Sequence, residues 1–179
     1  GCVVGLADMV IRSSTAIPED HLVLAVDLDG SFNRKGWIKC FDSTIGKTSA
    51  SILRLIEAMV RISRERLANA SRDISTPGFV GSIAMLCESS NVGAWIEVEK
   101  IPKPKNVALN LWLTTYPSSS FVVSTNKPEE CKKIFLEHGY HTETIGRITA
   151  DKRIILSYAG ESMVFLDLNK ESIFGLIGR

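Results

Sequence analysis

The chain shows two spacings of apolar residues, and each spacing predicts a different kind of element. Short apolar runs bounded by polar residues, or apolar residues at every second position, predict β-strands. Such runs occupy residues 2–11, 22–27, 93–99, 121–124, 144–149, 153–157 and 163–168. The predicted strands therefore gather toward the C-terminal half of the chain.

Apolar residues three or four positions apart predict helices. The longest predicted helix begins at Thr48 or Ser49, either of which can cap its first turn. Its apolar face carries Ile52, Leu55, Ile56, Met59 and Ile62, and its opposite, solvated face carries Arg54, Glu57, Arg61 and Arg64. Other helices are predicted from the end of a loop over 73–81 to residue 88, over 107–113, and from Asn126 and Pro128 to Gly139.

Residues 29–47 are polar, contain glycine and predict an irregular loop near the surface. Strands and helices otherwise alternate loosely along the chain and end in a strand-rich segment. This order favours a layered α+β or α/β domain over a β-sandwich or a helical bundle.

Composition sets outer limits on function. The 179 residues are enough for one domain with a sizeable core. The net charge of +1 produces no overall electrostatic attraction to nucleic acid or to a membrane surface. The longest apolar runs, 22–26 and 79–87, are too short to span a bilayer. The four cysteines form no C-x-x-C pair, so we expect free thiols in a reducing cytoplasm.

Gly46-Lys47-Thr48 resembles the end of a phosphate-binding P-loop. A P-loop also needs a glycine five positions before its second glycine, and Phe41 stands there. We therefore interpret Thr48 as a helix cap.

A second candidate site follows the apolar run at 22–26. Asp27-Leu28-Asp29-Gly30 matches the motif that haloacid-dehalogenase-like phosphatases use, in which the first carboxylate attacks phosphorus and the second acts as acid and base. The run 121–126 matches their second motif, an apolar strand that ends in Ser or Thr. The later paired aspartates are absent, because Asp151 and Asp167 are isolated. A phosphatase with Asp27 as nucleophile remains an alternative.

The three histidines support no metal site or hydrolytic triad. His138 and His141 flank the helix stop at Gly139 rather than sharing one helix face, and His21 is remote in sequence. We expect all three at the surface.

The loop after residue 72 is the strongest candidate site. Asp73 can accept a metal ion or a backbone N–H, Ser75 and Thr76 offer hydroxyls, and Gly78 and Gly81 let the main chain approach a ligand. The helix that follows adds partial positive charge at its N-terminus. The sequence thus predicts an anion- or phosphate-binding loop over 73–81, with a capped turn that binds nothing as the alternative.

Several motifs, in order, resemble the aminoimidazole ribonucleotide (AIR) synthetase superfamily, which is PurM-like and includes thiamine-monophosphate kinase, selenophosphate synthetase and formylglycinamide ribonucleotide amidotransferase. The matching segments are Asp73-Ile74-Ser75-x-x-Gly78-Phe79, Met85-Leu86-Cys87-Glu88-Ser89-Ser90-x-x-Gly93-Ala94, Ile96-Glu97-Val98, Ile101-Pro102, Trp112-Leu113-x-x-Tyr116-Pro117 and Thr144-Ile145-Gly146-Arg147-Ile148. Within the superfamily the sequence is most similar to archaeal AIR synthase-related proteins of the methanogenesis-marker group.

The resemblance implies a C-terminal domain with a three-layer α/β/α fold and a mixed sheet over residues 12–179. Residues 1–11 would be the last strand of a separate N-terminal domain that binds ATP and magnesium and builds a homodimer. Asp73, Ser75, Thr76 and Gly78 would border the cleft between the domains, with Asp73 a candidate metal ligand. Thr76-Pro77 departs from the family pattern, which often has Asp-Gly or Gly-Gly there.

The resemblance also implies a function. We expect an ATP-dependent, ligase- or kinase-like enzyme that activates a small-molecule substrate by phosphoryl transfer with Mg²⁺. Its partners would be its own N-terminal domain and a second copy, with no nucleic acid or membrane, and we expect this segment alone to turn over little. A non-catalytic, nucleotide-binding regulatory domain is the further alternative.

Overall fold

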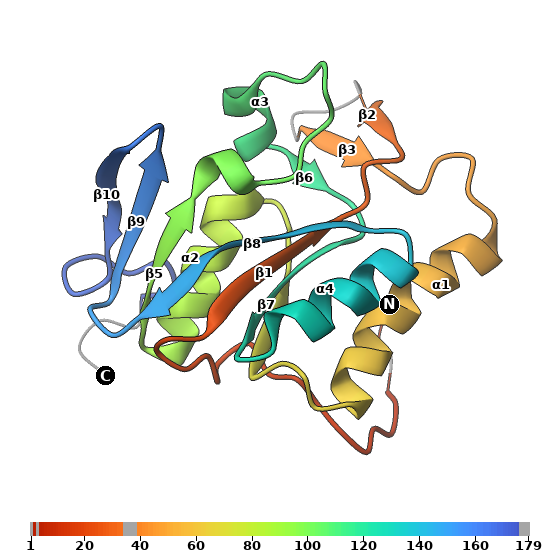
Figure 1. Cartoon of the computed structure of the whole chain (residues 1–179), viewed down its shortest axis with the longest axis horizontal. Coiled ribbons are helices and arrows are strands. Elements are labelled where there is room, and N and C mark those ends of the chain that lie inside the picture. Colours follow the sequence, from red (N-terminus) through yellow and green to blue (C-terminus); the bar gives the residue numbers. More distant parts are fainter. Residues whose placement is uncertain (1, 3, 34–38, 176–179) are drawn as a thin grey trace.

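The computed structural model describes residues 2, 4–33 and 39–175. Within that part of the chain, seven strands form a central sheet in the order β10-β9-β5-β8-β1-β7-β4 (Figure 1). The strands are β1 (His21–Val26), β4 (Ala70–Asp73), β5 (Gly93–Glu97), β7 (Ser120–Thr125), β8 (His141–Thr149), β9 (Arg153–Tyr158) and β10 (Glu161–Asp167). The pair β5–β9 is parallel and the neighbouring pairs are antiparallel, so the sheet is mixed.

Helices cover both faces of this sheet. On one face, α1 (Ser49–Arg64) and α4 (Pro128–Glu137) pack apolar side chains against β1 and β7. On the other, α2 (Gly78–Ser90) and the short α3 (Leu109–Leu113) bury the larger core, which includes Phe79, Ile83 and Trp112. The three-layer α/β/α fold with a mixed sheet is confirmed.

Local signals placed most of these elements correctly. The Thr48 hydroxyl accepts the Ser51 N–H at 3.2 Å at the start of α1, whose residues Leu55, Ala58 and Ile62 are buried. Several boundaries differ from the predictions: β5 ends at Glu97 in a short 3-10 helix (Val98–Lys100), β8 begins three residues before 144, and α2 already begins at Gly78. The edge strand β4 was not predicted. Among the described helices, none is long and apolar enough to cross a membrane.

The prediction of an irregular loop over 29–47 was wrong in part. Two short strands, β2 (Ser31–Asn33) and β3 (Cys40–Asp42), pair with each other, and β3 pairs with β6 (Tyr116–Pro117). Three-residue strands carry too little pattern to be recognised, and their stability comes from aromatic packing on Trp112. Residues 34–38 of the predicted loop lie outside the described residues.

The prediction of a strand over residues 2–11 was wrong for this chain. Its described residues form no strand, and Val4 and Leu6 are 92% and 105% exposed. A strand needs a neighbour for its backbone groups, and pairing begins only at Arg12, whose carbonyl accepts the Ser71 N–H of the edge strand β4 at 3.1 Å. That residues 1–11 complete a sheet of an N-terminal domain, with the boundary at residue 12, stays a prediction.

Strand β5 lies between two strands that follow each other in sequence. The turn at residues 150–152 joins β8 to β9, yet both strands pair with β5 rather than with each other. Gly93 begins β5 beneath this turn, and a Cβ there would lie 2.5 Å from the Arg153 carbonyl oxygen and 2.7 Å from Thr149 Oγ1. Only glycine fits this crossing without displacing backbone.

All four cysteines are free, and two of them are buried. Burial raises the pKa of the Cys87 thiol from 9.0 to about 12 and that of Cys131 to about 11. Because the thiolate is the reactive form, we expect iodoacetamide at about pH 8 to alkylate exposed Cys2 and to spare Cys87 and Cys131 in the native protein. Peptide mass spectrometry would check this, and equal labelling of Cys87 with and without urea would contradict its burial.

Candidate functional site

Several polar loops meet at one end of the central sheet. Strands β1 and β4 end there and the antiparallel β7 begins there, since Val26 pairs with Ser120 and Asp73 with Phe121. Helices α1 and α2 also begin at this end, directly after the loops that leave β3 and β4. We call the loops 27–30, 42–48, 73–78 and 118–120 together the polar end of the sheet.

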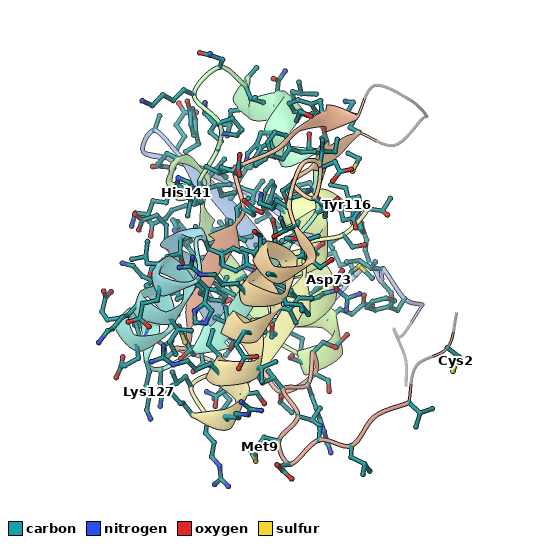
Figure 2. All side chains as sticks on the ribbon, turned by 90° about the vertical axis from the view of Figure 1, so that its right-hand side faces the viewer. Cys2, Met9, Asp73, Tyr116, Lys127 and His141 are labelled. Atoms are coloured by element: carbon teal, nitrogen blue, oxygen red, sulfur yellow. The ribbon has the colours of Figure 1, made fainter. Side chains whose placement is uncertain are left out.

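Asp73 is the last residue of β4, and its side chain is exposed. Figure 2 shows it on the side of the molecule that lies away from β9 and β10. Its carboxylate makes no hydrogen bond or ion pair with any residue that the structure describes. The carboxylate is therefore open to a ligand, and its place at a binding cleft stays a prediction.

The loop after Asp73 uses some of its polar groups internally. The Ser75 N–H donates to Ser82 Oγ at 3.1 Å, and the Gly78 N–H donates to the Ser75 carbonyl at 2.8 Å. The hydroxyl of exposed Thr76 has no partner in the described part of the chain. Pro77 stands at the N-cap of α2 and has no side chain that can accept a hydrogen bond. No N-cap side chain therefore accepts from the first N–H groups of this helix.

The two glycines of the loop have a packing reason. Gly78 adopts φ +72°, and a Cβ there would lie 2.5 Å from the Leu113 carbonyl oxygen. A Cβ on Gly81 would lie 2.5 Å from Pro77 Cβ. Close approach of α2 to α3 and to its own first turn therefore accounts for both residues, and approach of a ligand to them stays a prediction.

Sequence reasoning missed an ion pair at this end of the sheet. Lys47 Nζ donates to Asp27 Oδ2 at 2.8 Å, to the Asp29 carbonyl at 2.6 Å and to the Ser43 carbonyl at 2.8 Å. The side chains of Lys47 and Asp27 are only 14% and 3% exposed. The ammonium therefore has three acceptors, and it ties the loop after β1 to the loop before α1.

The dehalogenase-like phosphatase reading is wrong. Asp27 follows the end of β1, but β7 runs antiparallel to β1, so Thr125 lies opposite His21 at the other end of the sheet. The two motifs therefore cannot converge on one phosphate. Asp27 is also buried and neutralised by Lys47, and its Oδ1 accepts the Asp29 N–H at 3.1 Å.

The histidines and acidic residues form no cluster for a metal. Among the described residues, no group of three or more His, Cys, Asp or Glu side chains could hold an ion. His21 and His141 are exposed, and His138 is half-buried with Nδ1 2.7 Å from the Ile134 carbonyl oxygen. Metal binding at Asp73 therefore stays a prediction that needs further ligands from a substrate or another part of the protein.

Comparison with known proteins identifies the family. A sequence model described as AIR synthase related protein, C-terminal domain, matches residues 39–159. The chain belongs to this AIR synthase-related family. The domain is 33% identical over 177 residues to Uncharacterized protein MJ0640 of Methanocaldococcus jannaschii. This alignment covers 97% of the chain and 54% of that relative.

Solved structures show that the AIR synthase-related domain shares its fold with larger proteins. T. maritima PurL complexed with ATP matches with a TM-score of 0.70 at 17% identity, over 90% of this chain and 27% of PurL. Hydrogenase maturation protein HypE matches with a TM-score of 0.70 at 13% identity, over 94% of this chain and 59% of HypE. The predicted resemblance is confirmed, and the chain spans about half the length of MJ0640.

Proposed function

We propose that this AIR synthase-related domain forms one wall of an ATP-dependent phosphoryl-transfer site, with the loop 73–81 facing the anionic group. The observation that carries the proposal is that the exposed Asp73 and Thr76 side chains, in one loop, have no partner among the described residues, at the end of the sheet where α1 and α2 begin. Helix N-termini favour anions through their unpaired N–H groups and their partial positive charge.

Lys47 contributes no free charge to this site. Its ammonium is held by Asp27 and by two backbone carbonyls. Attraction for a phosphate must then come from backbone N–H groups and from a cation that Asp73 shares with the substrate. Mg²⁺ fits this donor set, because it is commonly bound by one or two carboxylates together with substrate phosphates and water. When bound, it would neutralise charge on the transferred phosphoryl group.

The fold neighbours support a nucleotide as the phosphoryl donor. PurL of T. maritima has been solved with ATP, with ADP and with FGAR. We propose that the full-length protein to which this domain belongs also binds a nucleotide. We propose that an N-terminal domain supplies the opposite wall, that the full-length protein is a homodimer, and that Asp73 and the Ser75–Gly81 loop orient a substrate whose oxygen accepts the phosphoryl group.

Replacing Asp73 with alanine tests this role. In the full-length protein we expect ATP-dependent phosphate release to fall about tenfold or more, as for removal of one group that stabilises transition-state charge. Thr76→Val should cause a smaller loss, since it removes one neutral hydrogen bond. Glu161→Ala, at an exposed carboxylate on β10, is the matched control and should keep full activity.

The outcomes separate the possible roles of the domain. Unchanged phosphate release in Asp73→Ala would refute a role for this loop. Tight ATP binding by calorimetry with no turnover in the full-length wild-type protein would indicate a nucleotide-binding regulatory domain instead. Steady ATP hydrolysis by the 179-residue chain alone, lost in Asp73→Ala, would refute the need for a second wall.

A further inference from the structure

Among the elements that the structure describes, no helix packs over one part of a sheet face. Helices α1 and α4 pack over β1, β7 and one end of β8, and the same face of β5, β9 and β10 stays bare (Figure 1). Strand register aligns one side chain from each of five strands across this face. The row consists of Val164, Ile155, Trp95, Arg147 and His21, in the order β10, β9, β5, β8 and β1.

A hollow of about 450 Å³ lies where this row reaches Trp95, Arg147 and His21. Its walls include the side chains of His21, Trp95, Glu97, Lys100, Thr144 and Arg147. Gly146 contributes only backbone to the lining, where β8 changes register against β1. Such irregularities re-aim the neighbouring side chain. The hollow lies at the start of β1, whereas Asp27 and the polar end of the sheet lie beyond its other end.

The hollow contains donors that the protein itself does not use. Lys100 is paired with Glu97 at 2.6 Å. Arg147 makes no ion pair or hydrogen bond with any residue in the described ranges, although Glu19 also lines the hollow. Thr144 Oγ1 is shielded from solvent and has no partner among the described residues. The half-buried Trp95 makes no hydrogen bond through its indole N–H with any described residue. The Arg147 guanidinium and the Trp95 indole N–H are therefore donors available to a ligand that enters the hollow.

We propose that this hollow binds a small molecule that carries a planar ring and an anionic group, either a carboxylate or a phosphate. The indole of Trp95 offers a flat apolar surface for the ring. Beside it, the Arg147 guanidinium matches the geometry of a carboxylate or phosphate and holds it by paired hydrogen bonds. The exposed His21 imidazole, which lies next to Arg147 in the strand register, supplies a further polar contact. The volume suits a small ligand.

Four probe molecules test separately whether the hollow recognises the planar ring and whether it recognises the anionic group. The protein is titrated with indole-3-acetate, phenyl phosphate, indole-3-acetamide and inorganic phosphate, and the indole N–H resonance of Trp95 is followed by NMR. We expect at least one of the two ring-bearing anions to bind in the millimolar range. The neutral amide and inorganic phosphate should each bind about tenfold or more weakly, because each lacks one recognised half. The preferred anion distinguishes a carboxylate ligand from a phosphate ligand.

Arg147→Gln is the decisive variant, because it is exposed and should leave the fold intact by its NMR spectrum. It should weaken binding of the ring-bearing anion about tenfold or more. Arg66→Gln, at an exposed arginine without a partner in the described part of the chain, should leave binding unchanged. Equal binding by wild type and Arg147→Gln, or no shift of the Trp95 resonance with either ring-bearing anion, would overturn the proposal.

Discussion

Lys47→Met is expected to lower the free energy of unfolding by about 3–5 kcal/mol, because it leaves the buried Asp27 carboxylate without its ion-pair partner. Asp27 is almost fully buried, and the Lys47 ammonium is its ion-pair partner at 2.8 Å. The substitution also removes the donor that joins the carbonyls of Asp29 and Ser43. Urea denaturation followed by circular dichroism would measure the loss.

Two variants make this result interpretable. Lys170→Met removes an exposed pair with Asp167 and should cost less than about 1 kcal/mol. The double variant Asp27→Asn with Lys47→Met leaves no charge buried and should recover part of the lost stability. If Lys47→Met does not fold, refolding of the double variant still checks the mechanism. A loss equal to that of Lys170→Met would show that the buried pair contributes nothing.

Gly78→Ala is expected to destabilise the protein by about 3–4 kcal/mol through two additive effects. The residue has φ +72°, which an L side chain adopts at a cost, and the new Cβ would meet the Leu113 carbonyl oxygen at 2.5 Å. The start of α2 would have to move away from α3. Thermal and urea unfolding would both report the change.

Gly46→Ala provides the matched control for backbone strain. Gly46 has a similar φ of +76°, but nothing lies within 4 Å of a Cβ built there. Its substitution should cost only the conformational term, about 1–2 kcal/mol. Equal losses of stability at the two positions would show that Leu113 moves away from the new Cβ at no energetic cost. The packing explanation of Gly78 would then be wrong.

Local signals were sufficient where an element's boundaries depend on its own residues. Helix α4 begins at Pro128 with Glu129 and Glu130 in its first turn, and Gly139 follows its end at φ +96°, as the sequence predicted. Strands β2, β3 and β4 were missed because each is only three or four residues long, and β3 and β4 also find partners far along the chain, in β6 and β7. A strand over residues 2–11 was predicted from its run of apolar residues, but no strand among the described residues pairs with it.

The candidate site was predictable only in its exposed parts. The exposure of Asp73 and Thr76 follows from their place between a strand and an apolar helix. The pairing of Lys47 with Asp27 joins residues twenty positions apart and has no signature in either local motif. The same limit explains the phosphatase misreading, because the motifs at β1 and β7 record strand ends but not strand directions.

The insertion of β5 between β8 and β9 affects the order in which the sheet assembles. A short turn at 150–152 lets β8 and β9 meet as a hairpin within microseconds, long before the distant β5 can arrive. Such a hairpin would be non-native and would have to reopen to admit β5, because β5 lies between β8 and β9 in the native sheet. Early pairing of β8 with β9 would therefore delay completion of the sheet rather than promote it.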